Sequence, residues 1–174
     1  MKRLIVVAGS VLALSGCSGS EPAAELKPYN SSLGFKVLIP EPVEDTGAYI
    51  PPLRESSVTF KSDQGSLRAG CSEFTDDQEG LAARQKLSSG PIAALDDASR
   101  RLVDSVHGKV SYQAPVKLHE RYEGRDIEGS TPDGRFHMRI FLVNGKFYQV
   151  CATGDAGFIS SNRSYNFLNS LEVN

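Results

Sequence analysis

The sequence has 174 residues, of which 40% are hydrophobic and 23% charged, and a formal net charge of −2. A chain of this length is long enough for one domain with a substantial core, and a second domain is not expected. The charge balance lacks a basic excess, which argues against a nucleic-acid partner and against purely electrostatic binding to an anionic membrane.

The chain begins with a segment typical of an export signal. Lys2 and Arg3 precede an apolar run, residues 4–14, that is interrupted only by Gly9 and Ser10. Eleven residues make a helix of about 16 Å, roughly half the thickness of the hydrocarbon layer of a bilayer. This run is therefore too short to span a membrane.

The apolar run ends in a four-residue motif, Leu14-Ser15-Gly16-Cys17, that resembles the lipobox of bacterial lipoproteins. The resemblance implies that residues 1–16 are removed as a lipoprotein signal peptide and that acyl chains such as palmitate are attached at Cys17. Two or more acyl chains hold a protein firmly at a membrane, whereas one binds only marginally. The alternative is an ordinary secreted protein in which Cys17 lies near the cleavage site by chance.

The residues after Cys17 bear on where the protein is anchored. Ser18 stands where, by the same resemblance, an aspartate would retain a lipoprotein at the inner membrane of a two-membrane bacterium. Its presence predicts attachment to the outer membrane, facing the periplasm. Residues 17–30 are small, polar and interrupted by proline, which indicates a lipidated flexible tether with a reach of about 20 Å. The globular domain is then expected over residues 31–174.

Cysteine usage predicts a disulfide. Once Cys17 carries lipid, Cys71 and Cys151 remain as an even pair in an exported protein, a setting in which disulfides persist. A bridge between Cys71 and Cys151 is therefore predicted. The alternative is two buried free thiols that pack as small hydrophobic side chains.

Alternating apolar and polar side chains predict strands in the first half of the domain. Residues 41–56 contain Pro51 and many turn formers, and they favour an extended but strand-poor conformation. The predicted strands cover residues 35–39, 57–61 and 67–74. The last two form a hairpin, and Leu67, Ala69 and Cys71 share the face of its second arm that would point inward.

Helical segments are predicted in the middle and near the end of the chain. A short helix is expected over residues 81–87, and a longer amphipathic helix begins at Pro91 and ends before Gly108. A further helix is expected around residues 158–168, followed by a last short strand over residues 171–173.

A meander of antiparallel strands is predicted between these helices. Residues 110–118 contain Pro115, which is typical of an edge or bulged strand. Residues 121–130 and 135–143 are joined by a turn that contains proline and glycine. The next turn, Asn144-Gly145, is a strong signal for a two-residue hairpin.

These two turns fix the register of the three strands that they join. Asp126 is expected to face Arg139, and Glu128 to face His137. One face of the sheet should belong to the core, with Ile127, Phe136, Met138, Ile140, Leu142, Phe147 and Cys151. The opposite, mixed face should carry Asp126, Glu128, His137, Arg139, Phe141, Tyr148 and Val150. The helix expected around residues 158–168 could cover the end of this face that carries Phe141 and Tyr148.

Several segments resemble the PsbP and Mog superfamily, which includes small bacterial lipoproteins of unassigned role. The segments are GFKVLIP, the mid-chain amphipathic helix, the strand around Gly124-Arg125, RIFLVNGKFYQV and FLNSLEV, and together they cover residues 31–174. The resemblance implies an α+β fold, an α/β/α sandwich around an antiparallel sheet of about six or seven strands. Superfamily members include a photosystem II extrinsic subunit and a Ran-binding protein, so the resemblance also implies docking on a larger assembly without catalysis.

Sequence motifs of catalytic and cofactor sites are absent outside the signal region. There is no GxSxG, Walker loop, HExxH, CxxC or dinucleotide fingerprint. His119 and Glu120 are neighbours, and neighbouring residues of a strand point to opposite faces, which makes them a poor metal-binding pair. We therefore predict no enzyme activity, no cofactor and no metal site.

Three functional hypotheses follow. The first is a non-catalytic accessory or assembly factor on a larger envelope complex, whose protein or glycan partner binds the mixed face through aromatic and arginine side chains. The second is a carrier of a small apolar ligand, which requires a pocket between sheet and helix. The third is an enzyme in which His137 and Glu128 form an acid/base pair. In the simplest alternative, the charged residues of the mixed face only form cross-strand pairs.

Overall fold

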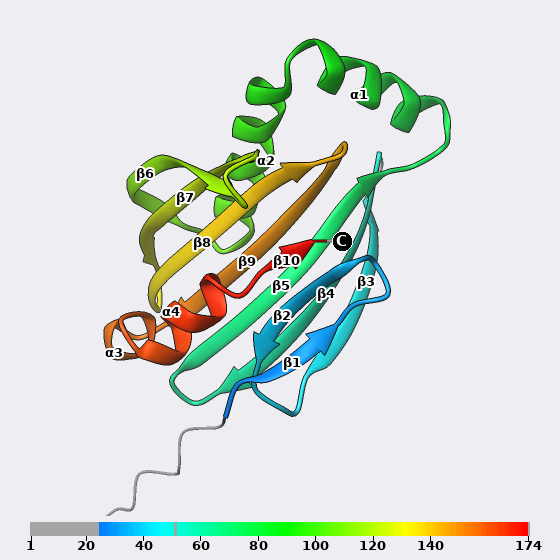
Figure 1. The fold of residues 1–174 in the computed structure, drawn as a ribbon. Coiled ribbons are helices and arrows are strands. Elements are labelled where there is room, and N and C mark those ends of the chain that lie inside the picture. The colour runs from blue at the N-terminus through cyan, green and yellow to red at the C-terminus, as the bar shows by residue number, and fades with distance from the viewer. Residues whose placement is uncertain (1–24, 51, 174) are drawn as a thin grey trace, which may run out of the picture.

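The computed structural model describes residues 25–50 and 52–173, which fold around a large antiparallel sheet (Figure 1). The elements are β1 (Lys27–Asn30), β2 (Phe35–Ile39), β3 (Glu44–Ile50), β4 (Leu53–Ser62), β5 (Gly65–Phe74), α1 (Gln78–Ser89), α2 (Pro91–Ser105), β6 (Lys109–Leu118), β7 (Tyr122–Thr131), β8 (Gly134–Val143), β9 (Lys146–Gly154), α3 (Ala156–Ile159), α4 (Asn162–Leu168) and β10 (Glu172–Val173). Within these residues the large sheet has seven strands in the order β3-β4-β5-β9-β8-β7-β6, and a small sheet has the order β1-β2-β10.

The N-terminal boundary of the domain differs from the predicted one. The predicted signal peptide and Cys17 lie outside the described residues. Residues 27–30, predicted as the end of the tether, form β1 and pair with β2 from Lys27 opposite Ile39 to Asn30 opposite Lys36. The folded domain therefore begins at Lys27, four residues before the predicted boundary at residue 31.

The two faces of the large sheet are covered by different layers. Helix α2 packs on one face over β7 and β8, where Leu95 and Leu102 meet Ile127, Phe136 and Met138. The small sheet, α3 and α4 cover the other face, as seen at the front of Figure 1. The structure is mostly β, and the α/β/α sandwich is confirmed only in part, because the second outer layer combines a sheet with two short helices.

The register predicted for the meander is confirmed. Glu128 lies opposite His137 and Asp126 lies opposite Arg139, as the turn between β7 and β8 implied. Asn144 and Gly145 have positive φ values of 49° and 80°, which suit the two-residue turn between β8 and β9. The predicted core face therefore packs against α2.

The prediction of a strand-poor segment at residues 41–56 is wrong. Strand β3 pairs with β4 along seven residues, from Glu44 opposite Thr59 to Ile50 opposite Leu53. It is an edge strand of the large sheet, and its residues 44–49 are all exposed. An edge strand held mainly by backbone hydrogen bonds needs no apolar alternation, so the pattern used to find strands is missing here.

The predicted disulfide between Cys71 and Cys151 is not formed, and both cysteines are buried free thiols. Their strands, β5 and β9, are neighbours, but Cys71 lies opposite Tyr148 whereas Cys151 lies opposite Arg68. The three-residue offset between positions 148 and 151 places the two sulfur atoms on opposite faces of the sheet. Cys71 accordingly belongs to the core under the small sheet, and Cys151 to the core under α2.

Candidate functional site

The charged residues of the mixed face come together on two neighbouring strands. We call Asp126 and Glu128 of β7, with His137 and Arg139 of β8, the polar cluster. His137 Nε2 lies 2.6 Å from Asp126 Oδ1 but 3.9 Å from Glu128 Oε1. The hydrogen-bond partner of His137 is thus Asp126, which lies two residues along β7 from Glu128, the residue that faces His137 in the register.

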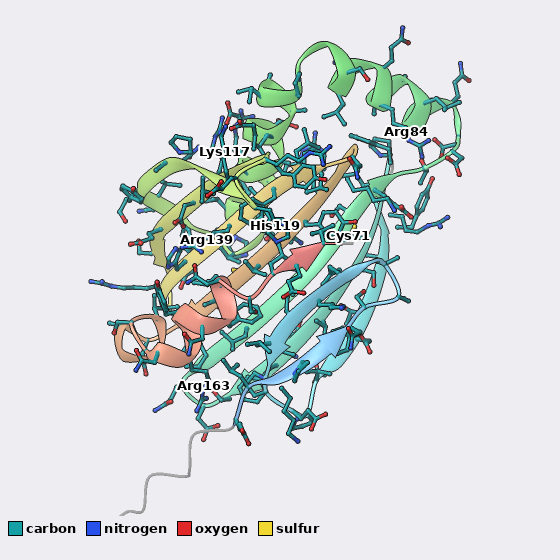
Figure 2. All side chains as sticks on the ribbon, in the orientation of Figure 1. Cys71, Arg84, Lys117, His119, Arg139 and Arg163 are labelled. Atoms are coloured by element: carbon teal, nitrogen blue, oxygen red, sulfur yellow. The ribbon has the colours of Figure 1, made fainter. Side chains whose placement is uncertain are left out.

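Arg139 connects the polar cluster to α4. Its Nη1 donates a hydrogen bond of 2.7 Å to Asn169 Oδ1, and its Nε lies 3.2 Å from Asp126 Oδ2. That Nε is buried and makes no hydrogen bond, so its contact with Asp126 is one of charge. Figure 2 shows Arg139 on β8 beside α4. The cluster is therefore held from two sides, by the sheet and by the end of the last helix.

Electrostatics keep Asp126 ionised. Burial alone would raise the pKa of its carboxyl group, but the hydrogen bond from His137 and the charge of Arg139 outweigh burial. The pKa of Asp126 consequently lies below its ordinary value. Asp126 is therefore a carboxylate at neutral pH, paired with both neighbours on β8.

Phe141 and Tyr148, predicted to be exposed aromatic contacts of a partner, are instead part of the core. They are only 3% and 5% exposed, and the ring of Tyr148 meets Phe35 of β2 edge to face at 6.3 Å. The core around them includes Phe158 and Phe167 from the C-terminal helical segment, which the sequence analysis allowed as a cover for this end. The small sheet was not expected there, because β1 and β2 lie far away in the chain. These two residues cannot contact a partner in this structure.

Two other tyrosines provide exposed aromatic surface on this side of the molecule. Tyr112 of β6 is 53% exposed and lies opposite Glu128, so both side chains leave the sheet on the face of the polar cluster. Tyr165 of α4 is 63% exposed, one helical turn before the Asn169 that binds Arg139. Tyr112 was not among the predicted site residues, because no distinctive turn in the sequence fixes the register of β6 on β7.

The polar cluster can recognise a partner by charge and by hydrogen bonding. Among the described residues, no group of three His, Cys, Asp or Glu side chains is arranged to hold a metal ion. The proposed acid/base pair of His137 and Glu128 is separated by 3.9 Å, and the Nε2 atom of His137 is already bound to Asp126. Glu128 remains half exposed at the open side of the cluster.

Comparisons with known proteins bear on the N-terminus and on the fold. Residues 1–18 match the prokaryotic membrane lipoprotein lipid attachment site. This match confirms the lipobox at Cys17 and supports a lipid-anchored location in the cell envelope. No curated protein matches the chain. No helix within the described residues is both long and apolar enough to cross a membrane.

The chain matches several solved structures, among them one from a cyanobacterium and one from Pseudomonas aeruginosa. The solution structure of cyanobacterial PsbP (CyanoP) from Synechocystis sp. PCC 6803 covers 92% of this chain and 99% of its own, with a TM-score of 0.53 and 14% identity. The crystal structure of a protein of unknown function from Pseudomonas aeruginosa covers 78% of this chain and 86% of its own, with a TM-score of 0.36 and 9% identity. The first match shows a shared fold. The chain therefore has a lipoprotein attachment site followed by a PsbP-like domain, as the sequence resemblance implied.

Proposed function

We propose that this protein is a non-catalytic accessory lipoprotein that docks on a larger protein complex of the cell envelope through the polar cluster and Tyr112. The acyl chains on Cys17 would hold it at the outer membrane, with the domain in the periplasm. The observation that carries the proposal is the row formed by Tyr112, Glu128 and His137 on three adjacent strands. This row presents the exposed ring of Tyr112 beside the half-exposed carboxylate of Glu128 and next to the hydrogen-bonded pair of His137 and Asp126.

Preorganisation favours this surface as a docking site. Asp126, His137 and Arg139 are each about one-fifth exposed or less, and their mutual contacts fix their side chains before a partner arrives. Binding to fixed groups loses less conformational entropy than binding to mobile ones. Tyrosine and arginine are also the side chains that most often dominate binding energy at protein interfaces.

The tether restricts where the domain can bind. Lys27 is the tenth residue after Cys17, so the start of β1 lies at most about 36 Å from the lipid-bearing residue. Strand β1 begins at the end of the large sheet where α3 and the turn between β4 and β5 lie (Figure 1). Because the tether is short, this end of the large sheet would face the membrane. The partner would then be a complex at or near the same membrane.

Site-specific photocrosslinking in living cells tests the proposal. A photoreactive amino acid is placed at Tyr112 of the full lipoprotein, and we expect a discrete crosslinked protein species. The change Glu128→Lys, added to this chain, should weaken the crosslink about tenfold because it reverses a charge next to the ring. A glycan partner would instead give a heterogeneous product that glycosidases remove.

The control is Glu123→Lys on the same strand. Glu123 has a similar exposure but points to the opposite face, where it pairs with Lys117. It should leave the crosslink unchanged. The proposal is contradicted when no discrete species forms, or when the two charge reversals weaken the crosslink equally.

A further inference from the structure

A cavity of about 540 Å³ lies between the two longer helices and one end of the large sheet. It falls within the range of roughly 300–1,000 Å³ that is typical of sites for small molecules. The lining residues are Pro52, Leu53, Phe74, Ala83, Lys86, Leu87, Gly90, Ala93, Ala94, Asp97, Ala98, Arg101 and Phe147. They include neither Tyr112 nor any member of the polar cluster, so the cavity is separate from the proposed docking surface.

The interior of the cavity is apolar. Phe74 and Phe147 meet edge to face with their ring centres 6.1 Å apart, and Phe147 and Leu87 are buried. Four of the lining residues are alanines, whose short side chains leave space between the helices and the rings. Apolar groups fill such a space favourably, whereas a polar group that enters it loses its hydrogen bonds to water without gaining others.

Helix α1 is held beside the cavity by polar contacts more than by apolar packing. Arg84, in the middle of the helix, donates to the backbone carbonyl oxygen of Phe74 and pairs with Asp76. Among the positions of α1 whose burial is described, Leu87 has the only buried side chain beyond glycine, and Leu81 is 55% exposed. The helix therefore walls the cavity without filling it, and an apolar occupant would supply the packing contacts that α1 lacks.

The charged lining residues lie at the mouth of the cavity and do not call for a charged ligand. Arg101 donates to Asp97 at 2.6 Å, and these side chains are 65% and 42% exposed, so each ion has the other and water as partners. Lys86 is exposed as well. An ionised group placed among the apolar walls would lose its water, which favours an uncharged ligand there.

We propose that this cavity binds a small uncharged apolar molecule, packed against Phe74, Leu87 and Phe147 between α1, α2 and the sheet. Helix α1 lies beyond the end of the large sheet that is opposite to the start of β1, and Figure 2 likewise places Arg84 of α1 and Arg163 of α4 at opposite ends. The cavity is thus remote from the lipid anchor, and the ligand is a separate molecule. Binding at this site is additional to docking, because the two surfaces lie on different parts of the domain.

Photolabelling tests both the place and the charge of the ligand. The full lipoprotein in phosphatidylcholine nanodiscs is irradiated with benzophenone, an uncharged two-ring molecule whose excited carbonyl group adds across nearby C–H bonds. We expect saturable labelling of peptides that contain Phe74, residues 83–98 or Phe147. The competitor 4-benzoylbenzoate has the same two rings and a carboxylate, and it should occupy the site about tenfold less well than benzophenone itself.

Hydrogen exchange gives a readout that does not depend on photochemistry. Benzophenone at saturation adds contacts to α1, so amide exchange over residues 80–88 should slow about fivefold. Exchange in β6, which does not line the cavity, should not change.

A matched pair of variants locates the site. Ala83→Trp places a large side chain in the cavity and should reduce benzophenone labelling about tenfold. Ala82→Trp is its control, because Ala82 is exposed on the same helix and does not line the cavity. Arg101→Gln removes a cation from the mouth and should change the labelling less than twofold, because the ligand carries no charge.

Four results would overturn the proposal. They are label that is absent or confined to other peptides, equal strength of 4-benzoylbenzoate and benzophenone, equal effects of Ala83→Trp and Ala82→Trp, and a fivefold loss of labelling in an Arg101→Gln protein with unchanged thermal unfolding. Labelling that appears only in Cys17→Ala would show that the acyl chains of Cys17 fill the cavity, and it would overturn the proposal too. Failure here leaves docking through the polar cluster untouched, because the two surfaces share no residue.

Discussion

Asp126 and His137 are joined across β7 and β8 by a hydrogen bond of 2.6 Å between Oδ1 and Nε2, and Arg139 lies against the other oxygen of the same carboxylate. Removing the charge of Asp126 leaves Arg139 partly buried without its counter-ion. We expect Asp126→Asn to lower the free energy of unfolding by about 1–3 kcal/mol at pH 7. Urea unfolding of both proteins measures this difference.

The pH dependence of that difference follows from the direction of the pKa shift of Asp126. Because the folded protein lowers this pKa, the carboxylate stabilises the fold fully above its unfolded pKa of about 3.9. The stabilisation is lost as the pH falls through the lower, folded value. The free energies of unfolding of wild type and Asp126→Asn should therefore begin to converge as the pH falls below about 4. A difference that stays constant down to pH 3, or that matches the effect of the exposed Glu128→Gln, would contradict this account.

A second prediction concerns the contact between Gly129 and Phe136. A Cβ atom at position 129 would lie 2.2 Å from the carbonyl oxygen of Lys109 and 2.6 Å from Cζ of Phe136, so β6 and the ring both approach the bare backbone. Gly129→Ala should destabilise the protein by about 2–3 kcal/mol because strand or ring must move. Gly47→Ala in β3 is the control, since its Cβ would lie 3.7 Å from the nearest atom. Equal melting temperatures of the two variants would contradict this prediction, because they would show that β6 can move away from position 129 with little loss of stability.

The meander that contains Gly129 and Phe136 illustrates what the sequence could predict. Both residues lie in a meander whose turns are short and chemically distinctive, and a fixed turn sets the position of every following pair. The α2 helix was equally readable, because its apolar side recurs with helical spacing and Pro91 occupies its first position. Local signals therefore recovered the second half of the large sheet and the layer that covers it.

Long-range strand pairing explains why the burial of Tyr148 and the separation of the two cysteines were not predicted. Strand β2 covers Tyr148 from more than a hundred residues away, and no local pattern distinguishes a covered aromatic residue from an exposed one. Cysteine parity predicted a bridge, yet the actual register puts Cys71 and Cys151 on different faces. In the candidate site, the sequence placed the four charged residues correctly. Phe141 and Tyr148 were wrongly included as partner contacts, because their burial depends on the small sheet. Tyr112 was missed because the turn between β6 and β7, at His119 and Glu120, carries no distinctive signal, so the register of β6 was not predicted.

The two buried thiols give a third prediction. Burial raises the pKa of Cys71 to about 11 and that of Cys151 to about 12, so neither is an appreciable thiolate at pH 8. Treatment of the native protein with iodoacetamide for a few minutes should leave both thiols unmodified. In urea without reductant, both should react fully, which intact mass spectrometry detects as two added groups. No reaction in urea until a reductant is added would instead show that the cysteines are bonded.

The last prediction concerns the anchor, because the proposed function places the domain at a membrane. Metabolic labelling with an alkyne analogue of palmitate should modify the wild-type protein and leave Cys17→Ala unlabelled, since the attachment site covers residues 1–18 and Cys17 supplies its thiol. Cys71→Ala should stay labelled, because that thiol is buried inside the domain. Ser18→Asp should keep the lipid but move the protein from the outer-membrane to the inner-membrane fraction of a two-membrane cell. Persistent label in Cys17→Ala, or a mature chain that still begins with Met1, would show that the protein is not held by lipid at Cys17.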